Sequence, residues 1–148
     1  MHTPPPHIQN LRLLGTSAAD TLGNVANAGN DLLVGGAGAD TLTGGAGADH
    51  FVYLSANDST AASPDVIADF SSLQHDVIDL HGLTAGLAHH AHLTFIGTAA
   101  FSATDATGQV RFDTGTNTLE ISTNADTTAE FQITLTGVAA LTKADLHF

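Results

Sequence analysis

Residues 35–43 read GGAGADTLT and residues 44–52 read GGAGADHFV, two nearly identical blocks of nine in direct succession. Glycines at the first, second and fourth positions permit tight turns with positive φ and inward-pointing carbonyl groups. The sixth position supplies a carboxylate, and the last three residues predict a short strand whose middle member faces the interior. The nine-residue period therefore predicts a repeat architecture in which each block builds the same unit.

The register extends to both sides of this tandem. Residues 26–34 read ANAGNDLLV and residues 15–23 read GTSAADTLG, with a two-residue insertion, Asn24 and Val25, between them. Residues 53–58, YLSAND, lose the glycines and keep an aspartate at the sixth position. A flexible glycine-rich linker is the alternative interpretation, but the strict register favours a folded structure. The strand residues expected to face the interior are Leu22, Leu33, Leu42 and Phe51.

The repeat spacing predicts a set of cation sites. Because each block makes half a turn, residues 18 apart stack at the inter-strand spacing of about 4.8 Å. Asp31 then lies over Asp49 and Asp40 over Asp58, whereas Asp20 and Asp40 are 20 apart, so we expect a distorted or weak site there. Stacked carboxylates and glycine carbonyls suit two to three Ca²⁺ ions better than the smaller Mg²⁺. The expected ligands are Asp20, Asp31, Asp40, Asp49 and Asp58, with Gly29, Gly35, Gly36, Gly38, Gly44, Gly45 and Gly47.

The composition limits the partners of the chain. Its 148 residues carry 15 acidic and 3 basic side chains, and the formal net charge is −12. The cations are Arg12, Arg111 and Lys143. This distribution argues against nucleic-acid binding and docking on anionic lipid. No segment is apolar over the length needed for membrane insertion, and no cysteine is available for disulfides or zinc–thiolate sites. The first ten residues, MHTPPPHIQN, lack the basic start and the apolar run that are typical of a secretory signal.

The repeat GGxGxDxUx, where U is a large apolar residue, resembles the RTX repeat of bacterial exoproteins. The following residues 64–80, PDVIADFSSLQHDVIDL, resemble the stretch after the repeats in serralysin-type metalloproteases and alginate epimerase R-modules. The resemblance implies a parallel β-roll that binds calcium, in the C-terminal module of a secreted, extracellular protein. It also implies an uncleaved signal for the type I secretion apparatus in the tail Asp145, Leu146, His147 and Phe148, where His147 departs from the apolar ending of the family.

The predicted fold is all-β, with a short parallel β-roll that continues into a β-sandwich-like C-terminal part. We expect a linker and lead-in strand in residues 1–14, the roll in 15–60, and the C-terminal part with the secretion tail in 61–148, as one continuous module. Alternating apolar and β-branched residues predict strands in HLTFIG, GQVRFD, NTLEIST and EFQITLTG.

The sequence offers little for catalysis, and we expect no enzymatic activity in this module, although a larger parent protein is an enzyme in some related families. The HExxH and GxSxG motifs are absent. Asp65, Asp69, Asp76 and Asp79 are interpreted as calcium ligands or turn caps rather than as a catalytic pair. A second cluster, His81, His89, His90 and His92, has a spacing that suits zinc, copper or nickel, but an exposed histidine-rich loop needs no ligand. His50 should point outward.

Three functions stay open at this stage. The first is a module that folds on extracellular calcium and carries the secretion signal. The second is a calcium-dependent module that binds an acidic polysaccharide, which the scarcity of cations disfavours. The third is an attachment or self-association module of an adhesin or surface-layer protein.

Overall fold

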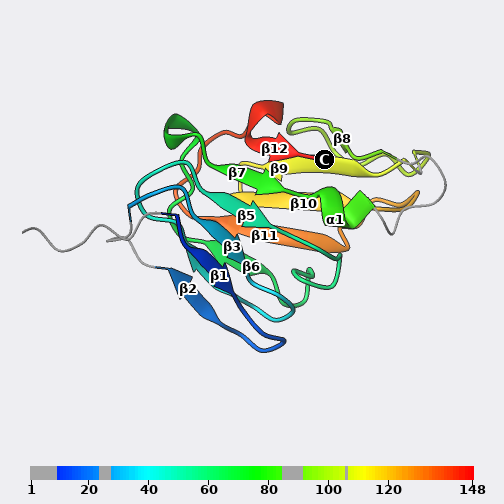
Figure 1. The fold of residues 1–148 in the computed structure, drawn as a ribbon. Coiled ribbons are helices and arrows are strands. Elements are labelled where there is room, and N and C mark those ends of the chain that lie inside the picture. The colour runs from blue at the N-terminus through cyan, green and yellow to red at the C-terminus, as the bar shows by residue number, and fades with distance from the viewer. Residues whose placement is uncertain (1–9, 24–27, 85–91, 106) are drawn as a thin grey trace, which may run out of the picture.

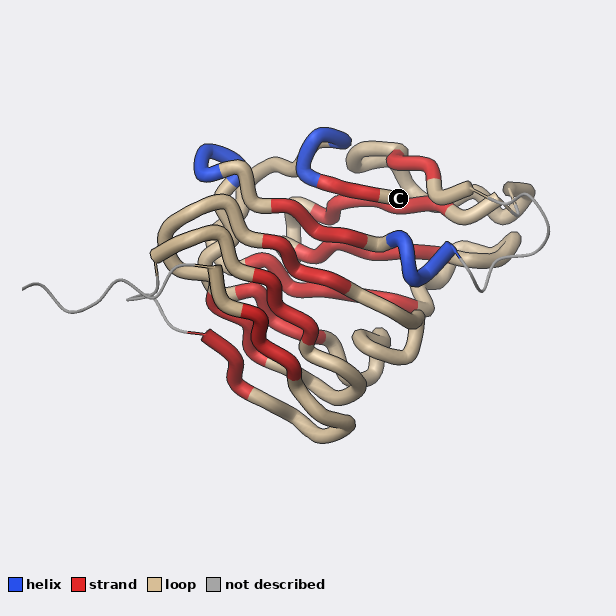
Figure 2. Tube along the Cα trace, viewed as in Figure 1, coloured by secondary structure: helices blue, strands red, loops and turns tan. Residues whose placement is uncertain are grey.

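The computed structural model describes residues 10–23, 28–84, 92–105 and 107–148. Within these ranges the chain forms two facing β-sheets, one of five strands and one of seven (Figure 1). Helical structure is confined to short turns at the periphery of the strands (Figure 2): α1 (His81–Thr84), η1 (Ser72–Gln74) and η2 (Lys143–Asp145). The predicted all-β class is confirmed.

The five-stranded sheet, sheet A, is parallel throughout. Its strands, in spatial order, are β1 (Arg12–Leu14), β3 (Leu32–Val34), β5 (His50–Val52), β7 (Val77–Asp79) and β12 (Leu146–His147).

The seven-stranded sheet, sheet B, begins with parallel strands and continues with an antiparallel meander of β11, β10 and β9. Its strands, in spatial order, are β2 (Thr21–Gly23), β4 (Thr41–Thr43), β6 (Asp65–Ile67), β11 (Phe131–Leu135), β10 (Thr118–Ser122), β9 (Gln109–Asp113) and β8 (Thr94–Phe95).

From β1 to β7 the chain alternates between the two sheets, so that each repeat contributes one strand to one side of a roll. Leu33 pairs with Phe51 across a separation of 18 residues, as the repeat predicts. Leu22 pairs with Leu42 across 20 residues, and the pairing of β2 with β4 is as regular as that of β3 with β5. The insertion therefore leaves the strand register intact.

The middle residue of each roll strand faces the space between the sheets. Leu33, Leu42 and Phe51 are fully buried, and Leu22 on the end strand β2 packs against the same core. The interior continues through Ile67, Ile78, Leu119, Ile121, Phe131 and Ile133 in the strands beyond the repeats. Burial of these side chains is the main apolar contribution to the stability of the fold.

The strands after the repeats extend the two sheets of the roll. β6 pairs in parallel with β4, and β7 pairs in parallel with β5. The C-terminal strand β12 in turn adds to β7. Each sheet contains strands from before and after residue 60. The predicted boundary between the roll and the C-terminal part at that residue stays a prediction. Within the described ranges, no helix has both the length and the hydrophobicity that a bilayer span requires.

Candidate metal centre

Six aspartates form two columns, one along each edge of the roll, and we call them the aspartate ladder. Each member directly precedes or begins a strand, so the strand pairing fixes the spacing of its neighbours. The first column leads into sheet B and contains Asp20, Asp40 and Asp65; the second leads into sheet A and contains Asp31, Asp49 and Asp76.

Within each column, one carboxylate oxygen of an aspartate accepts a hydrogen bond from the backbone N–H of the aspartate before it. Oδ1 of Asp40 accepts the backbone N–H of Asp20 at 2.7 Å, and Oδ1 of Asp65 accepts that of Asp40 at 2.8 Å. The second column repeats this pattern: the N–H of Asp31 donates to Asp49 at 2.8 Å, and that of Asp49 donates to Asp76 at 3.0 Å. These bonds fix the orientation of each carboxylate.

The second carboxylate oxygen, Oδ2, has no such hydrogen bond in four members of the ladder. Among the described residues, Oδ2 of Asp31, Asp40, Asp49 and Asp65 is buried and has no hydrogen-bond partner. A buried carboxylate oxygen without a partner destabilises a fold unless a cation or a donor compensates it. Two such oxygens lie in each column, on neighbouring turns, and oxygens of this kind fit a hard divalent cation.

Two glycines keep the space in front of these oxygens open. A Cβ atom on Gly35 would lie 2.4 Å from Oδ2 of Asp40, and one on Gly44 would lie 2.2 Å from Oδ2 of Asp49. Both distances are shorter than any real contact of a Cβ atom. The first glycine of the repeat is thus required by the free carboxylate oxygen and not, as the sequence predicted, by a positive φ.

Backbone carbonyl groups of the repeat loops also approach the glycines of the neighbouring turn. A Cβ atom on Gly15 would lie 1.9 Å from the carbonyl oxygen of Gly35 and 2.9 Å from Oδ2 of Asp20. On the other edge, a Cβ atom on Gly47 would lie 1.9 Å from the carbonyl oxygen of Gly29. Gly29, Gly36, Gly38, Gly45 and Gly47 have positive φ, which turns the loops tightly enough for this approach.

The donor set has the composition expected of a calcium site. In the described part of the chain, no three carboxylate or imidazole groups converge on one point. A cation in the ladder would therefore take few side-chain ligands and complete its shell with carbonyl oxygens, as Ca²⁺ does with six to eight oxygen ligands.

Burial raises the pKa of several ladder carboxyls. Desolvation is the largest cause, the backbone hydrogen bonds oppose it, and neighbouring aspartates add to it. The pKa of Asp65 rises to about 7 and that of Asp76 to about 6. The pKa values of Asp40 and Asp49 are raised in the same direction. These carboxylates are ionised at neutral pH only at a cost in stability.

No ion pair in the described ranges offsets this charge, and the side chains there that lower the raised pKa of a ladder carboxyl are Tyr53, at Asp65, and His50, at Asp49. Within the described ranges, the ion pairs join His81 to Asp79 and Arg111 to Asp113 and Glu120, all outside the ladder. Arg111 also lies over the ring of Phe101, at 5.0 Å from its centroid, on the sheet surface. The ladder is therefore a candidate site for a bound cation.

The structure corrects one predicted pair. Asp58 does not lie in the ladder; its Oδ2 accepts the N–H groups of Leu54 and Ser55 within its own loop. The place below Asp40 is taken by Asp65, 25 residues further on, because β6 and not residues 53–58 continues sheet B. The pair Asp31 with Asp49 is placed as predicted. Asp20 and Asp40 make the same hydrogen bond as the regular pair, in spite of the insertion.

Three aspartates beyond the repeats contact the repeat loops, and the sequence interpretation had treated them as calcium ligands or turn caps without placing them in the stack. Asp65 and Asp76 complete the two columns. Asp69 accepts the N–H of Gly44 at 3.0 Å and that of Gly45 at 2.8 Å, and so caps the loop below it. The D-x-I-x-D-F pattern was the available signal, but only the strand pairing shows that its first aspartate stacks under Asp40.

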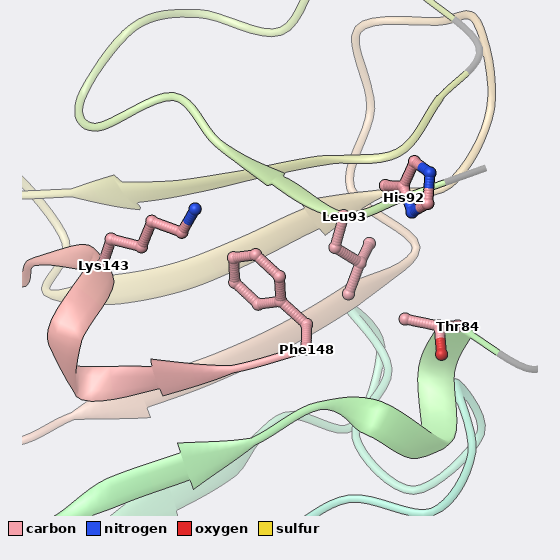
Figure 3. Close-up of a pocket in the computed structure, with 5 residues that line it drawn as sticks. All are labelled: Thr84, His92, Leu93, Lys143 and Phe148. Carbon is pink, nitrogen blue, oxygen red and sulfur yellow. The ribbon is translucent and has the colours of Figure 1, made fainter. Parts of the chain in front are cut away.

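One pocket among the described residues lies beside the C-terminal residue Phe148, and no ladder aspartate lines it (Figure 3). It has a volume of about 440 Å³ and is lined by Thr84, His92, Leu93, Lys143 and Phe148. The carboxylates once considered for catalysis, Asp65, Asp69, Asp76 and Asp79, do not line it.

The predicted histidine cluster is only partly visible. His89 and His90 lie outside the described residues. His81 contacts Asp79 through Nδ1 at 2.8 Å, and His92 lines the pocket.

Comparisons with known proteins show which family and fold the chain shares. Metalloprotease AprA of Pseudomonas entomophila (strain L48) is 41% identical over 94 residues, which are 62% of this chain and 19% of the relative. The chain thus spans about a fifth of the length of this relative. A subunit of the mannuronan C5-epimerase of Azotobacter vinelandii, solved in solution, matches 99% of this chain and 86% of its own with a TM-score of 0.52 and 29% identity. Residues 17–148 match the family described as Peptidase M10 serralysin C terminal, and the chain therefore belongs to that family as an RTX calcium-binding module.

Proposed function

We propose that the chain is a non-catalytic module that folds when its aspartate ladder binds extracellular calcium, and that it serves a bacterial exoprotein exported by type I secretion. The observation that carries the proposal is the set of four buried carboxylate oxygens without partners on Asp31, Asp40, Asp49 and Asp65. The family supports the same function, because the matching family model describes the C-terminal part of serralysin peptidases.

Calcium would bind between successive turns of the roll. We place the ions between the loops that carry Asp20 and Asp40, Asp31 and Asp49, and Asp40 and Asp65. The carbonyl oxygens of the glycine-rich turns complete each shell. We leave out the fourth neighbouring pair, Asp49 with Asp76, because both oxygens of Asp76 already accept backbone N–H groups, and so propose two to three ions.

The mechanism rests on electrostatics and mass action. Without calcium, stacked carboxylates repel one another and the glycine-rich loops lose much chain entropy on folding, so the unfolded chain is favoured. At millimolar calcium and site affinities of about 10⁻⁴ to 10⁻³ M, each ion contributes only about 1 kcal/mol. Several ions act on one continuous roll, and folding becomes cooperative. An unfolded chain can pass a secretion channel, and folding outside the cell prevents its return.

The test is circular dichroism and thermal melting of the whole chain in calcium, in magnesium and in a chelator. We expect the β-sheet signal and a cooperative melting transition in calcium, and a loss of both in the chelator. Magnesium at the same concentration should restore much less, since its shell is smaller and octahedral. Equal spectra in all three conditions would contradict the proposal.

A second candidate function is favoured by the likeness to the mannuronan C5-epimerase subunit. It is a calcium-dependent module for an acidic polysaccharide, in which a bound ion bridges carboxylates of the protein and of the glycan. The three cations of this chain offer little direct attraction to uronates. Titration with alginate oligomers in calcium separates the candidates, because a module that serves only folding and export shows no binding.

The parent protein is a separate part of the proposal. The relative in Pseudomonas entomophila is a metalloprotease, so we propose that this module accompanies a protease domain. Self-association through calcium, considered from the sequence, is tested by light scattering with and without calcium.

A further inference from the structure

The outer face of sheet A carries two histidines from distant parts of the sequence. His50 lies on β5 and His147 on β12, and β7 runs between these strands (Figure 1). Phe51 and Leu146, their neighbours in the chain, are buried against the core. Because side chains alternate along a strand, both histidines project from the outer face.

The two rings approach each other over β7. Two strand spacings separate their backbones by about 9.6 Å, and the residues are also displaced along the strands. The ring centroids are nevertheless only 6.1 Å apart, with an interplanar angle of 77°. Both side chains thus lean toward each other over the outer face.

This separation is close to the one that a shared metal ion requires. A nitrogen ligand lies about 2.0–2.1 Å from zinc, which places the ring centroid about 3.2 Å from the ion. Two tetrahedral histidine ligands then have centroids about 5 Å apart. The observed 6.1 Å is about 1 Å longer, a difference that small side-chain rotations remove.

The charge around the rings favours a cation. Asp79, on the intervening strand β7, is in register with His147 and also faces outward. Its carboxylate is held by His81, whose backbone N–H donates at 3.0 Å and whose Nδ1 lies at 2.8 Å. None of the three cationic side chains of Arg12, Arg111 and Lys143 belongs to β5 or β7. The two rings therefore sit beside a fixed negative charge.

We propose that His50 and His147 bind one divalent transition-metal ion of the zinc class on the outer face of sheet A. Solvent fills its remaining positions, since no third side chain within the described residues is placed to ligate it. The nitrogen ligands separate this site from the oxygen-rich aspartate ladder, because imidazole suits zinc and carboxylate suits calcium. The ion would connect the two-residue strand β12 to the repeat strand β5 across β7.

The experiment uses the whole chain in saturating calcium, titrated with zinc chloride by calorimetry. A background variant in which His89, His90 and His92 are replaced by Ala removes the competing cluster of the sequence. In this background, His50→Gln and His147→Gln should each weaken zinc binding by more than about tenfold. His75→Asn is the matched control, because His75 is exposed, lies in the η1 turn and has a φ of 68° that asparagine tolerates.

A second readout keeps the test independent of the calcium sites. Zinc should increase the hydrogen-exchange protection of β12 in the background variant and leave it unchanged in His147→Gln. All variants should keep the calcium-dependent melting transition, and His147→Gln, at the end of the chain, serves the test if His50→Gln fails to fold. Zinc affinity that survives both glutamine substitutions, or that falls equally in His75→Asn, would overturn the proposal. Failure of calcium-dependent folding in the parent chain would instead contradict the proposed function.

Discussion

At the scale of the residue, the middle aspartate of each column, Asp40 or Asp49, uses its two carboxylate oxygens for two different interactions. Oδ1 accepts a backbone N–H from the turn before, and Oδ2 faces a space that two glycines keep open. An asparagine could perform the first task through its side-chain carbonyl, but it would contribute no charge to the second. The two tasks are therefore separable by substitution.

Asp49→Ala should raise the calcium concentration at the midpoint of folding by about tenfold or more, because it removes both the buried oxygen and the bond to Asp31. The control is Asp105→Ala, since the carboxylate of Asp105 only caps the exposed turn at Thr107. Calcium titrations followed by circular dichroism give both midpoints. Equal shifts in the two variants would show that Asp49 is not a ligand.

Asp65→Asn should have opposite effects with and without calcium. Burial raises the pKa of Asp65 to about 7, so its ionised form destabilises the calcium-free fold. The neutral amide removes that charge while its carbonyl keeps the bond from the N–H of Asp40, and at pH 8 the calcium-free variant should gain about 2 kcal/mol. The same change should weaken calcium binding.

Thermal melting of Asp65→Asn and of the parent chain, in calcium and in chelator, measures both effects of that substitution, with the osmolyte TMAO added to the chelator samples so that the calcium-free fold is populated. A variant that loses stability in chelator as well would mean that Asp65 contributes to the fold through its charge and not in spite of it.

At the scale of the element, the nine-residue loop and strand form one unit whose spacing is set by the close approach of neighbouring loops. The carbonyl oxygens of one turn lie where a Cβ atom of the next turn would be, as at Gly15 and Gly47. A side chain there would separate the loops and with them the oxygens of the site. Glycine is thus part of the metal centre although it contributes no side chain.

Gly44→Ala tests this dependence, because its Cβ atom would lie 2.2 Å from Oδ2 of Asp49. We expect a rise of about tenfold or more in the calcium midpoint. Gly115→Ala is the matched control: neither glycine has positive φ, and Gly115 is exposed with only Oδ1 of Asp113 within 4 Å, at 3.2 Å. Isothermal calorimetry with calcium distinguishes the two, and a normal affinity in Gly44→Ala would place the ion elsewhere.

The sequence predicted correctly those features of the fold and the site that depend on the local repeat. The period of nine predicted the roll, the inward residues Leu33, Leu42 and Phe51, and the pair Asp31 with Asp49. It was wrong for Asp58, because residues 53–64 leave the roll: the Ser59 hydroxyl donates to the carbonyl of Gln132, on a strand more than 70 residues away. The return of the chain at Asp65 depends on pairing with β4 and β11, and a local pattern does not contain such long-range contacts.

At the scale of the whole molecule, the net charge of −12 and the two continuous sheets together determine how calcium affects stability. The strands beyond the repeats pair directly with the roll, through β6 with β4 and β7 with β5. A cation that stabilises the ladder therefore stabilises the meander of β9, β10 and β11 as well, since β11 pairs with β6. Calcium should act on one cooperative unit.

The pH dependence of stability follows from the same carboxylates. The pKa of Asp65 is about 7 and that of Asp76 about 6 in the folded state, against an ordinary value of 3.8 in the unfolded chain. Between these values the folded state binds more protons, so the calcium-free fold loses stability as the pH rises from about 4 to 7. We expect the free energy of unfolding without calcium to be about 3 kcal/mol or more higher at pH 5 than at pH 8.

Calcium should reverse this trend, because protons and the ion compete for the same oxygens. Its stabilising effect should be largest at pH 8, where the ladder is ionised, and should decline toward pH 5 as Asp65 and then Asp76 become protonated. Melting curves across this range, in calcium and in chelator with TMAO present to populate the calcium-free fold, measure both trends, and the Asp65→Asn variant should show the weaker dependence in chelator. A calcium-free stability that is flat or rises with pH would mean that the ladder carboxylates are not strained by burial, and the electrostatic basis of the calcium switch would be lost.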